Sequence, residues 1–219
     1  MSKKIGLFIR VPKNASTSIL SAFRDEEVRI KAQDLEHLEN LYCKNDSGIL
    51  YSKTGSKSRL IFEHSKHIDL EKVFSFGFVR NPYERAVSSF NLHSDPDLVK
   101  QWRGTKRDSF KEFLKYLSVK DLNPENEFNS HELLMSCEQY PFLIDEKSNK
   151  RVDFIGRVES IQKDIDFITN QLGLERIIVP HLNKTKLKEY QTYYDSESVD
   201  IVEKIYKRDI DFFQYKFEN

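Results

Sequence analysis

Residues 74–89 read FSFGFVRNPYERAVSS, and this stretch decides the fold. Its first part, residues 74–79, is a short apolar run, which indicates a buried β-strand. Pro82 follows at a position where proline can serve as the first residue of a helix. Apolar residues then recur at helical spacing: Tyr83, Val87 and Phe90. The stretch therefore predicts a strand, a turn that carries Arg80, and a helix.

The same order of elements is predicted at residues 5–23, which read IGLFIRVPKNASTSILSAF. The continuous apolar run 5–9 predicts a strand, and residues 16–23 carry apolar side chains at helical spacing. Two strand–turn–helix units in one chain, followed by further alternation of the two element types, favour a parallel sheet in a layered α/β fold. We expect one domain over residues 1–219, because this length supports a single well-packed core.

The rest of the chain shows weaker patterns of the same kind. Helices are predicted near 30–41 and over 110–117, the latter after the capping pair Asp108 and Ser109. Another helix is expected to begin at the capping pair Asn129 and Ser130 and to reach Met135. Further helices are predicted over 159–172, before Gly173, and over 196–213. Strands are predicted near 60–63, over 152–155 and over 177–179, and a flexible stretch over 45–58.

Composition limits the function classes. The chain has 35 basic and 35 acidic residues, so its formal net charge is zero, and a nucleic-acid partner is not expected. The two cysteines, Cys43 and Cys137, lack metal-ligand spacing and favour buried free thiols over a disulfide or a zinc site. The apolar run 5–9 is too short for a signal-peptide core or a membrane span, and we therefore expect a cytoplasmic location.

The first turn has the composition of an anion site. It reads Pro12, Lys13, Asn14, Ala15, Ser16, Thr17, Ser18. A lysine and three hydroxyls at the start of a helix can bind a phosphate, because the first N–H groups of a helix point outward and carry partial positive charge. The alternative is that Ser16 or Thr17 only caps the helix and Lys13 is solvated. The turn is not a Walker A loop, because it contains no glycine.

The second turn places Arg80 at the end of a predicted strand, where ligands of open parallel sheets bind. A guanidinium there can bind a phosphate through two parallel hydrogen bonds. Ser88 lies on the helix that follows and can face the same anion. The alternative is that Arg80 pairs with a carboxylate such as Glu84 and that Ser88 is a packing residue.

Taken together, the two turns resemble the two nucleotide-binding segments of the sulfotransferases that use 3′-phosphoadenosine-5′-phosphosulfate (PAPS), above all the carbohydrate branch acting on heparan, chondroitin and dermatan. The resemblance implies a P-loop-like three-layer domain with a central, mainly parallel sheet flanked by helices. It also implies that the loop from Pro12 to Ser18 holds the 5′-phosphosulfate end, and that Arg80 and Ser88 hold the 3′-phosphate. A late segment, His181 to Thr185, is similar to the family's loop near the nucleotide, which adds Asn183, Lys184 and Thr185 as candidate ligands.

The implied reaction is in-line transfer of a sulfuryl group to an acceptor hydroxyl, which leaves 3′-phosphoadenosine 5′-phosphate (PAP) and requires no metal in principle. Lys13 is the candidate for neutralising the oxygen that leaves with the nucleotide. The acceptor hydroxyl also needs a base. His67 resembles a histidine found at this place in relatives, and His64 and Glu63 are alternatives.

The residues are compatible with more than one acceptor. The resemblance favours a hydroxyl of a carbohydrate, whereas the residues alone also allow a glycolipid, a small polyol or a peptide tyrosine. Asn14 and Ala15 stand where relatives often carry Thr/Cys-Gly or Ala-Gly. The basic run from Lys100 to Arg107 can bind an acidic sugar or be a solvated face. Two other readings remain: a small-metabolite kinase of P-loop type, and a non-catalytic nucleotide-binding protein of the same fold.

Overall fold

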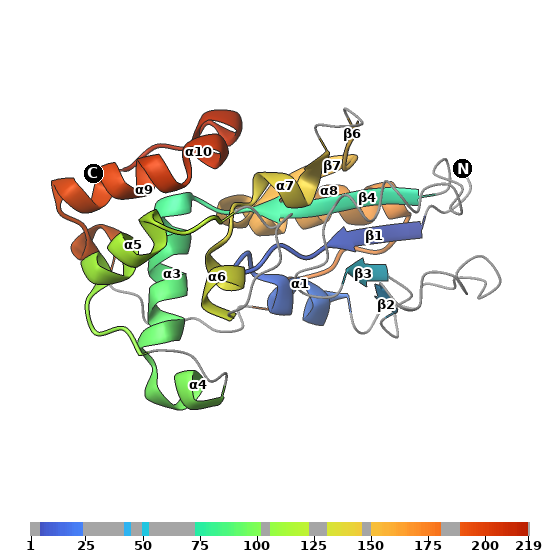
Figure 1. Cartoon of the computed structure of the whole chain (residues 1–219). Helices are drawn as coiled ribbons and strands as arrows, with labels where there is room; N and C mark the ends of the chain where they lie inside the picture. Colours follow the sequence, from blue (N-terminus) through green and yellow to red (C-terminus); the bar gives the residue numbers. More distant parts are fainter. Residues whose placement is uncertain are drawn as a thin grey trace. The chain divides into compact units, whose positions relative to one another are not determined.

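The structure is a computed structural model that describes residues 5–23, 42–44, 50–52, 73–101, 106–122, 131–145, 150–180 and 189–218. It divides into two compact units, each described by itself below (Figure 1). Unit 1 comprises Met1–Val79 and Pro141–Asn183, and unit 2 comprises Arg80–Tyr140 and Lys184–Asn219. The prediction of one domain over the whole chain stays a prediction.

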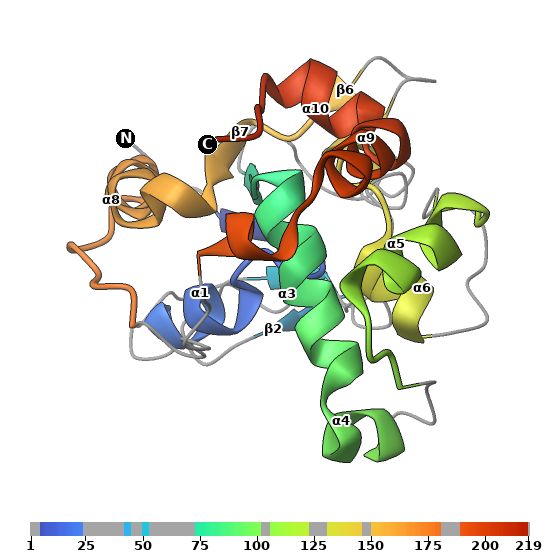
Figure 2. The same cartoon turned by 90° about the vertical axis from the view of Figure 1, so that its left-hand side faces the viewer.

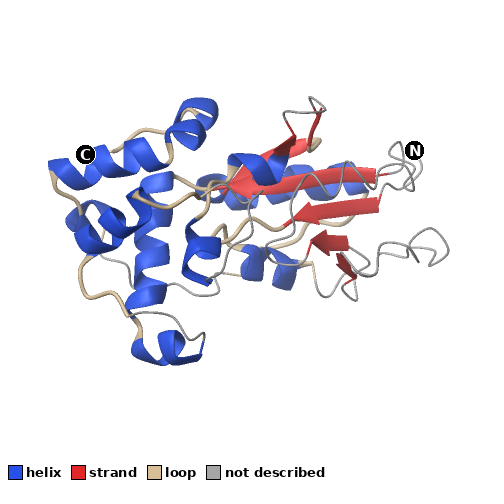
Figure 3. Cartoon of the chain, viewed as in Figure 1, coloured by secondary structure: helices blue, strands red, loops and turns tan. Residues whose placement is uncertain are grey.

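Unit 1 contains a five-stranded sheet of order β2-β3-β1-β4-β7. Its strands are β1 (Ile5–Ile9), β2 (Tyr42–Lys44), β3 (Leu50–Ser52), β4 (Val73–Val79) and β7 (Phe154–Arg157), drawn red in Figure 3. The neighbours among β3, β1, β4 and β7 pair in parallel, and β2 pairs with β3 in antiparallel orientation. The predicted α/β fold with a mainly parallel sheet is therefore confirmed.

One face of this sheet packs against two helices, α1 (Ser16–Ala22) and α8 (Ile161–Leu172). Phe8 of β1 and Phe76 of β4 lie at the centre of that core, with ring centroids 5.3 Å apart. Apolar side chains of the helices complete it: Ile19, Ala22, Ile165, Ile168 and Leu172. All of β4 is buried, which explains why its sequence, VFSFGFV, contains no charged residue.

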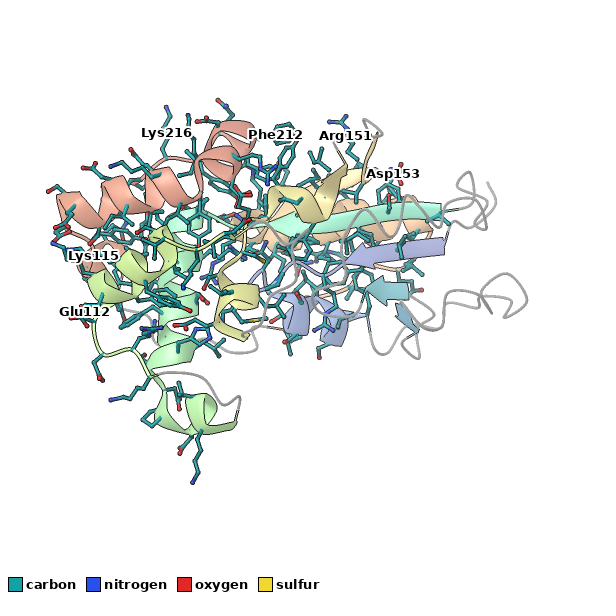
Figure 4. The ribbon with its side chains drawn as sticks, viewed as in Figure 1. Glu112, Lys115, Arg151, Asp153, Phe212 and Lys216 are labelled. Carbon is teal, nitrogen blue, oxygen red and sulfur yellow. The ribbon has the colours of Figure 1, made fainter. Side chains whose placement is uncertain are left out.

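The other face of β4 is covered at Gly77 by Leu143 of helix α7 (Tyr140–Leu143). A Cβ atom at residue 77 would lie 2.2 Å from a methyl carbon of Leu143, so a larger residue there would require the Leu143 side chain to move. A small hairpin, β5 (Ile144–Asp145) and β6 (Lys150–Arg151), follows α7. Asp153, labelled in Figure 4, then ties β4 by accepting hydrogen bonds from the amide and the hydroxyl of Ser75, both at 2.7 Å. The three layers of the predicted fold are thus present.

Unit 2 is helical and is built around α3 (Pro82–Ser94), which stands in the centre of Figure 2. Around it lie α5 (Phe110–Ser118), α6 (His131–Ser136) and α9 (Ser196–Ile205), with the short elements α4 (Pro96–Gln101), η5 (Tyr190–Tyr193) and α10 (Lys207–Phe213). The core is rich in aromatic rings, including Tyr83, Phe90 and Phe113. Unit 2 therefore fixes the helix that follows the turn carrying Arg80.

Most predicted elements within the described residues are confirmed. The strand over 5–9, the helix that begins at Pro82, the cap at Ser109 and the helix stop at Gly173 are all present. The helix expected near 30–41 and the strand near 60–63 lie outside the described residues.

Four details are wrong. The strand expected over 152–155 is displaced to β7, and the stretch 45–58 contains β3, which pairs with β1. Residues 177–179 form no strand, because the side chain of Gln162 bonds their main chain in place of a neighbouring strand. The helix expected over 196–213 breaks at Tyr206 into α9 and α10.

None of the helices among the described residues is long and apolar enough to cross a membrane. Nor do the same ranges hold a cluster of three metal-ligating side chains. The expected cellular location stays a prediction.

Candidate active site

The loop between β1 and α1 has an unusual backbone. Lys13 and Ala15 have φ values of 66° and 56°, so both occupy the left-handed region, while Asn14 between them does not. Left-handed residues in such a loop can turn successive N–H groups towards one side, as in the anion-binding concavity called a nest. The sequence of this loop contains no glycine and therefore gives no sign of its two left-handed residues.

The same loop is anchored to the neighbouring strand. Asn14 is buried, and its side-chain amide donates a hydrogen bond to the main-chain oxygen of Phe78 in β4 at 2.6 Å. The hydroxyl of Ser16 donates to the carbonyl of Val11 at 3.2 Å, which closes the turn across its base. Side chains thus hold the loop at both ends.

The remaining loop residues differ in exposure. Pro12 and Ser18 are buried, Lys13 is half-buried, and Thr17 is exposed. Ala15 precedes the helix without a side-chain cap, so the predicted alternative of a simple serine or threonine cap does not describe this helix start. Thr17 is therefore the most exposed of the three hydroxyl-bearing residues of this loop.

Unit 2 contains the second turn. Arg80 directly follows the last residue of β4, and its guanidinium forms an ion pair with Glu84 at 2.7 Å between Nη2 and Oε1. The predicted alternative partner of Arg80 is therefore its partner in this structure. The pair lies near the surface, with side-chain exposures of 13% for Arg80 and 31% for Glu84.

Ser88 shares a face with this ion pair. Residues four apart on a helix are neighbours, so Glu84 and Ser88 lie one turn apart on α3. Both are half-exposed, whereas the residues on the opposite side of α3 are buried: Tyr83, Ala86, Val87 and Phe90. Arg80, Glu84 and Ser88 therefore form one solvent-accessible stripe, which we call the 80/84/88 stripe.

The start of α3 is fixed locally. Asn81 caps the helix, since its side-chain oxygen accepts from the amide of Tyr83 at 3.0 Å, and Pro82 is the first helical residue. The side-chain amide of Asn81 also donates to the main-chain oxygen of Lys216, a residue labelled in Figure 4, at 3.2 Å. The C-terminal segment thereby holds the turn that carries Arg80.

Two residues that the sequence analysis missed support Arg80: Gln139 contacts its main chain, and Asp209 holds Gln139. The side-chain amide of Gln139 forms hydrogen bonds with both main-chain polar atoms of Arg80, and Asp209 accepts from the main-chain N–H groups of Gln139 and Tyr140. Burial raises the pKa of Asp209 to about 6, although nearby Arg85 opposes that shift. Their sequence context carries no motif, so only the tertiary contact reveals them.

Several predicted site residues lie outside the described residues. These are the three base candidates, Glu63, His64 and His67, and the late-loop candidates, Asn183, Lys184 and Thr185. Their roles stay predictions. Of the basic run, the described Arg107 binds Glu132 through two hydrogen bonds and stacks on Tyr116, and Lys106 pairs with Asp108. Residues 102–105 of the run lie outside the described residues, so both interpretations of the run stay predictions.

The thiol prediction can be checked at one cysteine. Cys137 is a buried free thiol, and burial raises its pKa to about 12, which makes it unreactive at neutral pH. The prediction is therefore confirmed for Cys137. Cys43 lies in β2, and the state of its side chain stays a prediction.

The class of protein is indicated by a mainly parallel sheet in an α/β fold, with Lys13 in the loop after β1 and Arg80 directly after β4. The chain belongs to the sulfotransferase family, whose sequence profile matches residues 3–216. It is similar to carbohydrate sulfotransferase 10 of Xenopus laevis, with 23% identity over 68% of this chain and 49% of the relative. Carbohydrate sulfotransferase 12 of the same organism is 23% identical over 74% of this chain and 44% of the relative. The chain thus spans about half the length of these relatives, and the predicted resemblance is confirmed.

Proposed function

We propose that this chain transfers a sulfuryl group from PAPS to a hydroxyl of a carbohydrate acceptor. The observation that carries the proposal is the backbone of the loop from Pro12 to Ser18, in which left-handed Lys13 and Ala15 flank Asn14. A nest beside a lysine suits an anion such as the 5′-phosphosulfate. Membership of the sulfotransferase family supports the reaction type.

In the proposed reaction, the acceptor oxygen attacks sulfur and forms a new S–O bond while the bond from sulfur to the 5′-phosphate oxygen breaks. Lys13 neutralises the negative charge that develops on that leaving oxygen. The acceptor's proton passes to a base, for which His67, His64 and Glu63 are the candidates. Arg80 and Ser88 hold the 3′-phosphate of the donor, with Arg80 supplying the charge.

The names of the two relatives support a carbohydrate acceptor, because both are described as carbohydrate sulfotransferases. In-line transfer of this kind requires positioning and charge stabilisation and no metal in principle. A cytoplasmic location remains part of the proposal and is tested by localising the full-length protein in cells.

Donor binding is tested by calorimetry with PAP in the absence of Mg²⁺. We expect wild type to bind PAP, and Lys13→Ala and Arg80→Ala to weaken binding by at least about tenfold each, equivalent to about 1.4 kcal/mol. Arg151→Ala is the matched control, since Arg151 is exposed on the hairpin strand β6 (Figure 4) and should leave the affinity unchanged. Tighter binding of ATP with Mg²⁺ than of PAP would replace this proposal with the kinase alternative.

Transfer itself is tested with sulfur-labelled PAPS and a panel of desulfated glycosaminoglycans, simple sugars and tyrosine peptides. We expect label in a carbohydrate and none in the peptides. Substitution of the true base among His67, His64 and Glu63 by alanine should abolish transfer while PAP binding persists. PAP binding without transfer to any acceptor would favour the non-catalytic alternative.

A further inference from the structure

We propose that Gln139 is a positioning residue that sets the affinity for the donor's 3′-phosphate by fixing the main chain of Arg80. This inference rests on the proposed function and deepens it, because it assigns a residue of unit 2 that the sequence motifs do not contain. The contacts that carry it all lie within unit 2.

The first contact is a paired hydrogen bond. The side-chain oxygen of Gln139 accepts from the main-chain N–H of Arg80 at 2.9 Å, and its side-chain nitrogen donates to the carbonyl of Arg80, also at 2.9 Å. Two such bonds to one residue reproduce the pairing that a residue in an antiparallel strand receives from its partner. They define both the position and the orientation of the Arg80 backbone.

The two hydrogen bonds between Gln139 and Arg80 lie directly beyond the end of a strand. β4 ends at Val79, where its ladder with β7 pairs Val79 with Arg157. Arg80 is therefore the first residue beyond the ladder, and its main chain is held by the amide of Gln139. Gln139 is fully buried, so water does not compete for these hydrogen bonds.

Gln139 is itself held by the C-terminal helix. Both carboxylate oxygens of Asp209 in α10 accept from the main-chain N–H of Gln139, at 3.0 and 2.8 Å, and one also accepts from Tyr140 at 2.8 Å. Arg208, the neighbour of Asp209, forms an ion pair with Glu138. Helix α10 thus fixes the segment 138–140, and that segment fixes Arg80.

The guanidinium of Arg80 depends on this backbone. Its side chain forms an ion pair with Glu84, which lies one helical turn before Ser88 in the 80/84/88 stripe. A small change in the main chain at residue 80 moves the guanidinium away from that stripe, because the side chain pivots at the Cα atom. A variant with a displaced Arg80 backbone should therefore discriminate less between nucleotides with and without a 3′-phosphate, although the charge of Arg80 is retained.

The test compares two nucleotides that differ only in the 3′-phosphate, PAP and adenosine 5′-phosphate (AMP). The measured quantity is the ratio of the AMP dissociation constant to the PAP dissociation constant. Gln139→Met keeps the volume and removes both hydrogen bonds, and we expect it to reduce this ratio by at least about tenfold. Asp209→Asn, which keeps one acceptor oxygen, should reduce it by a smaller factor.

The matched control is Tyr206→Phe. Tyr206 is buried in the same unit, and its hydroxyl donates to the carbonyl of Ser136 at 2.7 Å, so the substitution removes a buried hydrogen bond that does not involve Arg80. It should leave the nucleotide ratio within about twofold of wild type even though it lowers stability.

A second readout is hydrogen exchange at the main-chain amide of Arg80, measured by NMR. Gln139→Met should accelerate that exchange by at least about tenfold relative to the amides of α9, because the acceptor is gone. An unchanged nucleotide ratio, or equal weakening of PAP and AMP, in a folded Gln139→Met variant would overturn the inference about Gln139 and leave the proposed function standing. A wild-type ratio near one would instead overturn the proposed function.

Discussion

The side-chain nitrogen of Asn14 lies 2.6 Å from the main-chain oxygen of Phe78, and this hydrogen bond joins the loop after β1 to the end of β4. The two residues are 64 positions apart in sequence. Because β1 and β4 are parallel neighbours, their carboxyl ends meet at one edge of the sheet, and Asn14 fastens the loop there. The left-handed residues Lys13 and Ala15 flank this anchor on both sides.

The first prediction concerns that anchor. Asn14→Ala should lower the free energy of unfolding by about 1–3 kcal/mol, because a buried carbonyl loses its donor. It should also weaken PAP binding, since the loop loses its fixed shape. Urea denaturation and calorimetry measure the two effects. Thr17→Ala is the stability control, because Thr17 is exposed and should change the unfolding free energy by less than about 0.5 kcal/mol. Equal effects of the two substitutions on the free energy of unfolding would contradict the anchor.

The second prediction concerns backbone strain. Ala15 has φ of 56°, a conformation that costs a residue with a Cβ about 1 kcal/mol and costs glycine nothing. Ala15→Gly should therefore raise the thermal midpoint or leave it unchanged. Ala22→Gly, within the same helix α1 and at a core position, should lower stability by about 1 kcal/mol or more. Thermal unfolding of the pair checks the opposite signs, and a clear loss of stability in Ala15→Gly would refute the strain argument.

The third prediction concerns the ion pair. Glu84→Gln removes from the 80/84/88 stripe a negative charge that competes with the phosphate for the guanidinium of Arg80. We expect PAP to bind about three- to tenfold more tightly, with the gain shrinking at high salt. The control is Asp211→Asn, which breaks an exposed ion pair of the same i, i+4 type with Lys207 in α10. Weaker binding in Glu84→Gln would mean that Glu84 orients Arg80 rather than competing for it.

The fourth prediction is a pH dependence. Burial raises the pKa of Asp209 to about 6 in the folded protein, above its ordinary value of 3.8, so the folded state holds this proton more tightly than the unfolded state. The resulting stabilisation is complete below about pH 4 and is lost as the pH rises through about 6. The carboxyl carbon of Asp209 should titrate near pH 6 by NMR. A midpoint below 4 would show that Arg85 and the N–H donors outweigh burial.

The local patterns of the sequence were sufficient for the main strand–turn–helix units. The apolar runs of β1 and β4, Pro82 at the first position of α3 and Gly173 after α8 each depend on a few consecutive residues. The strands β2 and β3 were missed because three residues carry little periodicity, and pairing with neighbours decides their conformation. The break at Tyr206 was missed because the apolar spacing continues across it.

The sequence by itself determined the family, the main strand–turn–helix units, and the two turns that carry Lys13 and Arg80. The tertiary structure alone decided how those turns are held: Asn14 binds a carbonyl 64 positions away, Gln139 binds Arg80 over 59 positions, and Asp209 binds Gln139 over 70. Local propensity encodes consecutive residues, whereas a hydrogen bond between a buried side chain and a distant main chain forms only when packing brings the two together.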